Sequence, residues 1–312
     1  MIQPNTFRKT TRQAFMLLMA VSQTFSLLAQ SPKRKQFIET NGPVQTIKQD
    51  GNILYMGGSF TGAGYKTGRA ALMSTSNDFP NASFPRINGT VNAIISDNNN
   101  GWFIGGNFSK VGTTTVANLV HILADKTVDP NFLPNPNSTV QSLTLAGGKL
   151  YVGGSFTNIG SNAYKRLAAL DPASGVPTDW NPGVDNTIYS IDVNGNVVTI
   201  GGSFSKIGDK DVSYYAKIDG TTGNVLPAIT FNSYIYSLRR NNGALYAGGS
   251  FTSGGFQTGK IAHFSGTNDQ PTFTFPRVTG AINAIIDDGA GGWYIGGSFY
   301  QVGGINKQRL AH

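Results

Sequence analysis

A short glycine-containing motif returns six times along this chain of 312 residues, at a nearly constant interval. Its third copy reads LYVGGSFTNIG, from Leu150 to Gly160. The first glycine of the pair recurs every 47 or 48 residues, and another glycine follows it seven residues later in every copy. A fixed period of this length predicts an array of similar units, a solenoid or a propeller, in which each unit packs on its neighbours.

The third unit shows what one period contains. VQSLTL (140–145) predicts a first strand, LYVGGSF a second, RLAALD a third and the proline-containing VPTDWNP a weaker fourth. Asn-Gly and Asp-Gly pairs recur between the first and second strands, where they suit tight hairpins. Four antiparallel strands with proline in the outermost one are typical of a propeller blade. We therefore expect an all-β fold, a six-bladed β-propeller of four-stranded blades over residues 37–312.

The glycine pair lies inside the predicted second strand. A phosphate-binding loop would need a helix to follow, and no helical apolar pattern follows any copy. We interpret the glycines as allowing the neighbouring sheet to approach closely, with the phenylalanine two positions later filling the space between units. The residues assigned this structural role are Gly57, Gly58, Phe60, Gly105, Gly106, Phe108, Gly153, Gly154, Phe156, Gly201, Gly202, Phe204, Gly248, Gly249, Phe251, Gly296, Gly297 and Phe299.

The two ends of the repeat array suggest how it closes. Phe37 precedes Val44 at the spacing that aromatic residues keep before later first strands, and the chain ends at His312 inside a third strand. We expect the segment around Phe37 to complete the last unit and so remove the open edges. The similarity of FPRINGTVNAII to FPRVTGAINAII leaves a fragment of a longer array as the alternative.

The first 30 residues differ from the repeats. Arg8, Lys9 and Arg12 precede AFMLLMAVSQTFSLLAQ, an apolar stretch with polar residues in its middle and the small Ala29 near its end. This pattern predicts a secretory signal peptide over residues 1–29 in preference to a membrane-spanning helix. We expect a basic segment over residues 30–36, a secreted or cell-surface location, and no integral membrane segment once the signal is removed.

Charge and cysteine content restrict the partners and cofactors. The net charge is +8, but basic residues concentrate in the predicted signal and at Lys33, Arg34 and Lys35. The repeats are nearly neutral and lack the dense basic face that nucleic acid requires, so we predict no nucleic-acid partner. The chain has no cysteine, which excludes disulfides and thiolate metal sites.

No catalytic group stands out. His121, His263 and His312 occupy one repeat position, so the repeat should hold them apart, which argues against a shared metal. Acidic residues such as Asp97 and Asp288 fall in predicted turns, where aspartate usually bonds its own backbone. Neither a glycosidase carboxylate pair nor a Gly-x-Ser-x-Gly elbow is recognisable. We predict no metal, no cofactor and no catalytic residue.

Tyrosines interrupt the repeat in units four and five. Tyr189 and Tyr236 hold the first-strand position at which the other units carry Gln45, Asn92, Gln141 and Asn283. First strands line the central channel of a propeller, so these six residues with Arg239 form the candidate ligand-binding set, suited to a sugar or a peptide. Packing between units is the other role open to these side chains, and the one that we prefer from the sequence alone. Further residues of this region are Tyr214, Tyr215, Tyr234 and Arg240.

The unit LYVGGSFTNIGSNAYKRLAALDPASGVPTDWNP resembles the delta-60 repeat of bacterial secreted propellers, and is similar to that of certain fungal cell-surface proteins. The shared pattern is Gly-Gly-x-Phe, the later glycine, a basic residue before an apolar strand, and an aromatic residue with Asn-Pro. In the fourth unit we place Tyr215 at the position of the basic residue. The resemblance implies a secreted propeller over Phe37–His312 and supplies no catalytic residues.

These features predict an exported binding or scaffolding module for a glycan or a protein, acting as a monomer or as part of a longer chain. One alternative is a carbohydrate-active hydrolase or lyase with aspartates at the channel mouth. Another is a structural adhesin domain of a longer protein.

Overall fold

A computed structural model describes residues 40–50, 53–62, 70–74, 84–241, 243–254, 256–257, 260–264, 271–272, 276–288 and 292–312. Strands, turns and bends account for all the regular structure in these residues, and they contain no helix. The prediction of an all-β chain is therefore confirmed for this part. The predicted signal peptide, the basic segment and Phe37 lie outside it, as does the proposed closure of the last unit by Phe37.

Each of the six units contributes three main strands. The first strands are β1 (Val44–Asp50), β4 (Thr90–Ser96), β9 (Val140–Ala146), β14 (Ile188–Asn194), β20 (Ile235–Asn241) and β27 (Ile282–Asp287). The second strands are β2 (Ile53–Gly58), β5 (Trp102–Asn107), β10 (Lys149–Gly154), β15 (Val197–Gly202), β21 (Ala244–Gly249) and β28 (Trp293–Gly297). The third strands are β3 (Ala70–Ser74), β8 (Leu119–Ile122), β13 (Leu167–Leu170), β18 (Tyr215–Asp219), β24 (Ile261–Phe264) and β31 (Leu310–Ala311).

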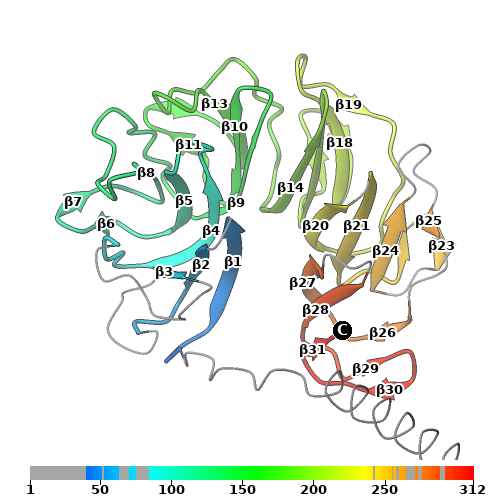
Figure 1. The fold of residues 1–312 in the computed structure, drawn as a ribbon. Coiled ribbons are helices and arrows are strands. Elements are labelled where there is room, and N and C mark those ends of the chain that lie inside the picture. The colour runs from blue at the N-terminus through cyan, green and yellow to red at the C-terminus, as the bar shows by residue number, and fades with distance from the viewer. Residues whose placement is uncertain are drawn as a thin grey trace, which may run out of the picture. The chain divides into compact units, whose positions relative to one another are not determined.

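Within every unit the second strand lies between the first and the third, and all pairs are antiparallel (Figure 1). A fourth strand joins two of these sheets, as β19 (Val225–Leu226) and β25 (Pro271–Thr272). In two other units the equivalent segment makes a single bridge, Ile122 with Val128 and Leu170 with Pro177. Proline at this edge donates no hydrogen bond, which fits its outermost place.

Two-residue strands form small hairpins between the second and third strands. They are β6 (Lys110–Val111) with β7 (Thr114–Thr115), β11 (Asn158–Ile159) with β12 (Asn162–Ala163), β16 (Lys206–Ile207) with β17 (Lys210–Asp211), β22 (Ser253–Gly254) with β23 (Phe256–Gln257), and β29 (Gln301–Val302) with β30 (Ile305–Asn306), the last joined by β26 (Val278–Thr279). The later glycine of the motif turns the chain with positive φ, at +58° in Gly112 and Gly160 and +59° in Gly208. This conformation favours glycine.

Every first strand carries a β-bulge opposite the glycine pair. In the fourth unit Ile188 pairs with Gly202 and Ser190 with Gly201, so the residue between them has no partner. The same shift occurs in the other five sheets. The residues at the bulge are Gln45, Asn92, Gln141, Tyr189, Tyr236 and Asn283. These six residues, with Arg239, make up the candidate ligand-binding set, and a bulge redirects the side chain it contains.

The two glycines of each pair are required for different steric reasons. A Cβ on Gly201 would lie 2.5 Å from Cγ2 of Ile235 in the next unit, so this glycine admits the neighbouring sheet. A Cβ on Gly202 would instead lie 2.3 Å from the carbonyl oxygen of Thr187 in its own unit. The interpretation as an inter-sheet contact therefore applies to the first glycine. The second glycine is required because the bulge brings the backbone of its own first strand close.

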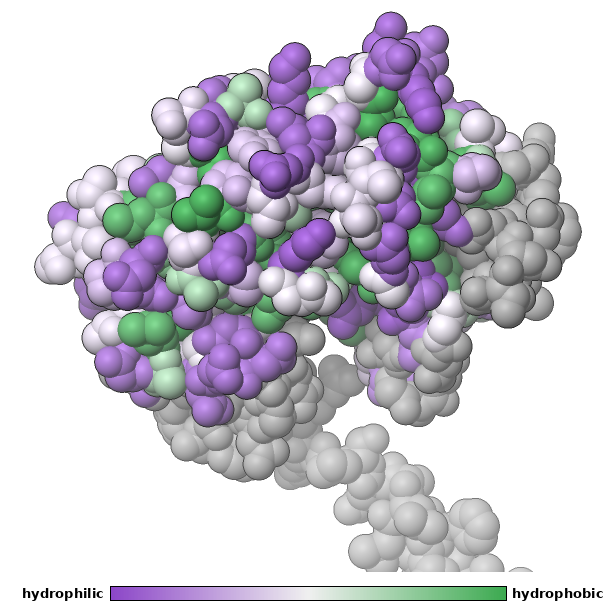
Figure 2. Space-filling view, turned by 90° about the horizontal axis from the view of Figure 1, so that it is seen from above, coloured by the Kyte–Doolittle hydropathy of each residue, from purple (hydrophilic) through white to green (hydrophobic). Residues whose placement is uncertain are grey.

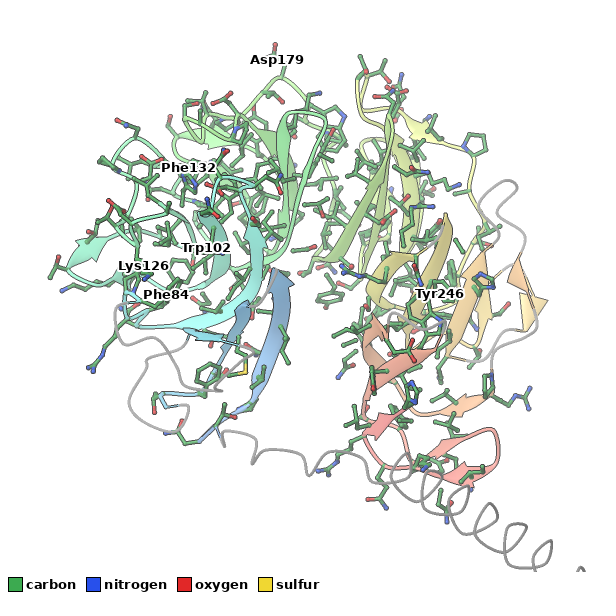
Figure 3. The ribbon with its side chains drawn as sticks, in the orientation of Figure 1. Phe84, Trp102, Lys126, Phe132, Asp179 and Tyr246 are labelled. Carbon is green, nitrogen blue, oxygen red and sulfur yellow. The ribbon has the colours of Figure 1, made fainter. Side chains whose placement is uncertain are left out.

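The hydrophobic core is divided into layers between successive sheets. Ile188 and Ile191 of β14 pack in one cluster with Tyr151 and Leu167 of the preceding unit. The six phenylalanines after the glycine pairs are all buried. They are Phe60, Phe108, Phe156, Phe204, Phe251 and Phe299. Other aromatic residues add to the layers, as where Phe84 meets Trp102 with ring centroids 6.0 Å apart (Figure 3).

The register of β18 corrects one assignment made from the sequence. Tyr215 pairs with Gly201 as Leu167 pairs with Gly153, so Tyr215 is the first apolar residue of its third strand. Tyr214 takes the position of the basic Arg166, and the two share a left-handed backbone with φ of +68° and +66°. The placement of Tyr215 at the basic position was therefore wrong by one residue. Tyr214 has the backbone conformation of Arg166 but carries no charge, so the residue type did not reveal that the two positions are equivalent.

Candidate functional site

The first strands of consecutive units lie side by side, β1 with β4, β4 with β9, β9 with β14, β14 with β20 and β20 with β27. Polar groups near the bulges connect them. Asn92 donates from Nδ2 to the carbonyl oxygen of Val140 at 2.9 Å, and the backbone N–H of Leu238 donates to Ser190 Oγ at 2.9 Å. Asn92 therefore has a structural role between two strands, which the sequence did not distinguish from ligand binding.

The two tyrosines at the bulge positions of units four and five face each other. The ring centroids of Tyr189 and Tyr236 lie 5.4 Å apart with planes inclined at 57°. Tyr234 extends the group, at 6.3 Å from Tyr236 and 5.5 Å from Tyr214. Ser250 Oγ donates to the Tyr236 hydroxyl oxygen at 3.0 Å. We call Tyr189, Tyr214, Tyr234 and Tyr236 the tyrosine cluster.

The tyrosine cluster is open to solvent. Tyr234 is 41% exposed, and the other three are partly buried. Phenol rings that meet at an angle leave hydroxyls and ring edges available, and such surfaces bind both sugars and peptides. Of the predicted set, the structure therefore brings Tyr189 and Tyr236 together, while Gln45 and Asn283 are exposed and Gln141 is partly buried on other units.

Arg239 and Arg240 are adjacent in the sequence but have different surroundings in the structure. Arg239 is exposed on β20. Arg240 donates from Nε and Nη2 to one oxygen of Asp192 on β14, at 3.0 and 2.8 Å, and from Nη1 to the carbonyl oxygen of Gly243 at 3.0 Å. Arg240 thus fixes one first strand to its neighbour.

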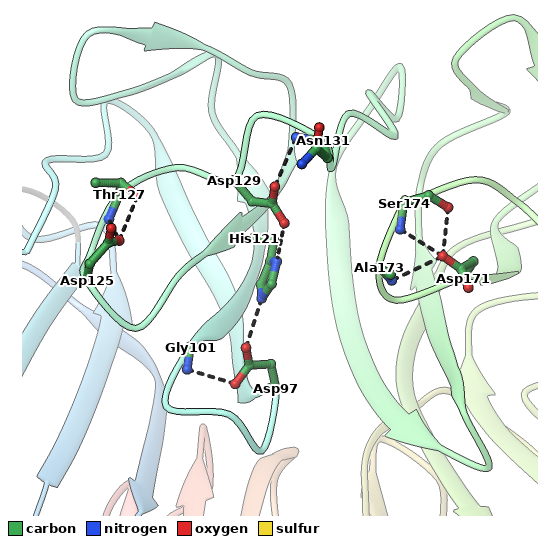
Figure 4. A network of polar contacts seen from close by, with 10 residues as sticks. All are labelled: Asp97, Gly101, His121, Asp125, Thr127, Asp129, Asn131, Asp171, Ala173 and Ser174. Atoms are coloured by element: carbon green, nitrogen blue, oxygen red, sulfur yellow. Dashed lines mark hydrogen bonds and ion pairs between the residues drawn. The ribbon is translucent and has the colours of Figure 1, made fainter.

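A second cluster of polar side chains lines a cavity of about 590 Å³ beside the first turns of units two and three. His121 on β8 lies between two carboxylates, with Nε2 3.0 Å from Asp97 and Nδ1 2.9 Å from Asp129 (Figure 4). Its ring stacks on Phe103 at 4.4 Å, and the register of β5 with β8 places the two residues opposite each other.

Hydrogen bonds keep Asp97 ionised. Burial raises the pKa of Asp97, but the backbone N–H groups of Asn99 and Gly101 and the ring of His121 outweigh burial and hold the pKa below 3.8. The N–H groups of Asn99 and Gly101 lie 2.7 Å from Oδ1. A carboxyl group with a depressed pKa is a poor proton donor, so Asp97 does not suit the acid role of a glycosidase.

The pair of Asp97 and His121 recurs in the last unit. His312 Nε2 lies 2.7 Å from Asp288, which also accepts a hydrogen bond from the N–H of Gly292 at 2.8 Å. The predicted turn role of these aspartates is present, with a histidine in the third strand (His121) or directly after it (His312) as an additional partner. The described residues contain no group of three or more His, Cys, Asp or Glu side chains placed to hold a metal. Asp129, eight residues after His121, was not singled out from the sequence because no spacing rule connects these positions.

Comparison with known proteins concerns the fold. A scan of protein-family models and a search of curated proteins found no match. Among solved structures, the computationally designed Ika8 protein matches 87% of this chain and 75% of its own, with 12% identity and a TM-score of 0.53. The WD40 domain of Pan2 from Neurospora crassa matches 82% of this chain and 73% of its own, with 13% identity and a TM-score of 0.55.

The chain has the β-propeller fold. A further structural neighbour is the extracellular domain of the one-component system BT4673 from B. thetaiotaomicron, with 16% identity and a TM-score of 0.55. That match covers 90% of this chain and 35% of the neighbour's chain. In the part that the structure describes, no helix is long and apolar enough to cross a membrane.

Proposed function

We propose that this propeller is an exported binding or scaffolding module, and that its ligand, a glycan or a protein segment, contacts the tyrosine cluster. The observation that carries the proposal is the meeting of Tyr189 and Tyr236 at bulges of adjacent first strands, with rings 5.4 Å apart and partly exposed. Bulges direct side chains away from the sheet, and clustered tyrosines supply broad contact area with little loss of side-chain entropy.

The wider architecture of the proposal is a six-bladed ring of four-stranded blades related to the delta-60 repeat. Six repeat units, the four-stranded sheets of units four and five, and the glycine contacts between units support it. Export rests on the basic and apolar start of the sequence. The face drawn in Figure 2 is a mixture of hydrophilic and smaller hydrophobic areas, as expected of a surface in contact with water.

The test begins with a glycan array and a panel of extracellular peptides, followed by titration calorimetry on each hit. We expect Tyr189→Ala with Tyr236→Ala to weaken binding at least about tenfold, because the ring surface supplies the contact. The thermal unfolding midpoint should fall by only a few degrees. Tyr300→Ala, an exposed tyrosine of the last unit, is the matched control and should bind normally.

Two outcomes would contradict the proposal. One is binding that survives loss of both tyrosines, and the other is collapse of the fold in the double variant, which would assign the rings to packing. Turnover of a bound glycan would instead favour the hydrolase alternative.

A further inference from the structure

The cavity of about 590 Å³ between units two and three is separate from the tyrosine cluster. Its wall on unit two includes Asp97, His121 and Asp129, and its wall on unit three includes Leu145, Pro172 and Ala173. Figure 4 shows the histidine between its two carboxylates and, across from them, the turn that contains Ala173. Leu145 lies near the end of β9, whereas the bulge residue Gln141 lies near its start. The cavity is therefore at the opposite end of the strand from the bulge, and its volume is in the range of pockets that hold small molecules.

The lining of this cavity is acidic. Asp97 and Asp129 are accompanied by one histidine, and the described residues that line the cavity include no lysine or arginine. The lining therefore carries a net negative charge whether or not His121 is protonated. Asp129 accepts a hydrogen bond from the backbone N–H of Asn131 at 2.9 Å, and Asp97 accepts two from its own turn. These bonds fix both carboxylates, and each keeps a lone pair for a further donor.

The equivalent gap between units three and four contains an ammonium group of the protein itself. Lys149 of unit three donates from Nζ to the carbonyl oxygen of Gly220 of unit four at 3.0 Å. The strand registers place Gly220 at the repeat position of Pro172, which lines the cavity. In unit two the position of Lys149 is held by Gly101, where a Cβ would lie 2.4 Å from Oδ2 of Asp97. Unit two therefore supplies carboxylates to its gap but no cation.

We propose that the cavity between units two and three binds a small molecule with a primary alkylammonium group. This ammonium is the counterpart of the Lys149 side chain in the next gap, and its three N–H donors bond the carboxylates of Asp97 and Asp129. Its carbon chain lies against the apolar side chains of Leu145 and Pro172. The acidic lining repels an anion, and a neutral alcohol lacks the charge that the carboxylates attract.

The test is calorimetric titration of the chain at pH 7 with pentylamine and with pentan-1-ol, which has the same carbon chain without the charge. We expect pentylamine to bind and the alcohol to bind at least about tenfold more weakly, because hydrogen bonds to charged groups are the stronger ones. Nα-acetyl-lysine amide is a second arm. Binding as strong as that of pentylamine would make a lysine side chain of a peptide the source of the ammonium, and weaker binding would make it a free amine.

Variants test the two parts of the site. Asp129→Asn removes one carboxylate and should weaken pentylamine binding at least about tenfold. Ala173→Trp, at an exposed residue, fills the cavity without changing either carboxylate, so it should also remove binding and remains decisive if Asp129→Asn fails to fold. Asp125→Asn, at an exposed aspartate outside the cavity, is the matched control and should bind like the wild type.

Three results would overturn the proposal. They are no binding of pentylamine by the wild type at concentrations up to about 10 mM, equal binding of the amine and the alcohol, and binding that survives Ala173→Trp. The variant that lacks the rings of Tyr189 and Tyr236 should bind pentylamine normally, so this site and the tyrosine cluster can be tested independently.

Discussion

At the scale of single residues, the hydrogen bonds from Asn99, His121 and Gly101 to Asp97 make stability depend on pH. The pKa of Asp97 lies below 3.8 in the folded state, so the folded chain binds this proton less readily than the unfolded chain. The stabilisation is therefore complete above the unfolded pKa and disappears as the pH falls through the folded pKa.

We expect Asp97→Asn to lower the free energy of unfolding by about 2 kcal/mol at pH 7, because the carboxylate accepts three hydrogen bonds. The difference from the wild type should shrink below about pH 4, because the unfolded wild-type chain then binds the proton more readily than the folded chain. Urea unfolding at pH 7 and pH 3 measures both values. Asp179→Asn, on the projecting loop labelled in Figure 3, is the control and should match the wild type. A difference that is constant with pH would contradict this account of Asp97.

The sequence indicated part of this arrangement. Asp97 follows a strand and precedes Asn-Asn-Asn-Gly, which predicts bonding to its own turn. Its contact with His121 depends on the register of β5 with β8, and composition does not determine register. The role of the second glycine of each pair, as Gly202, was missed for a related reason, because it arises from a bulge on a different strand.

At the scale of elements, the bulge on each first strand had a signal in the sequence. Buried residues on one face of a regular strand are two or four positions apart. Val140 and Leu143 are three apart, as are Ile188 and Ile191, and all four are buried. Apolar residues at this spacing within a predicted strand indicate an extra residue between them. This spacing could have located the bulge at Tyr189, but it was not used to predict one.

The ion pair between β14 and β20 gives a prediction at this scale. Arg240→Ala should lower the free energy of unfolding by about 2 kcal/mol, because it leaves the carboxylate of Asp192 partly buried without its two donors. Arg239→Ala, at the exposed neighbouring residue, should change the stability by less than about 0.5 kcal/mol. A double-mutant cycle with Asp192→Asn should give a coupling energy of about 1 kcal/mol or more. Equal effects of the two arginine variants would contradict a role for Arg240 between the strands.

At the scale of the whole molecule, the period of 47 or 48 residues and the hairpin turns sufficed to predict a propeller. Repetition makes this possible, because a rule that holds for one unit holds for its neighbours. Repetition also hides what differs between units. Val44 is 37% exposed, and a Cβ on Gly296 would meet only the carbonyl oxygen of Arg309 at 3.9 Å. Both residues have the same local sequence pattern as their equivalents in the other units.

The account rests on sheets that pack face to face through the first glycine of each pair. Its most direct test compares the free energies of unfolding of Gly201→Ala and Gly296→Ala, measured by urea titration at a concentration where the chain is monomeric. The two positions are equivalent in the repeat, but a Cβ at Gly201 would lie 2.5 Å from Ile235, while one at Gly296 would meet only the carbonyl oxygen of Arg309, at 3.9 Å. We predict a loss of about 2 to 3 kcal/mol for Gly201→Ala and a change within about 0.5 kcal/mol for Gly296→Ala. Equal losses at both positions would contradict the packing of the units.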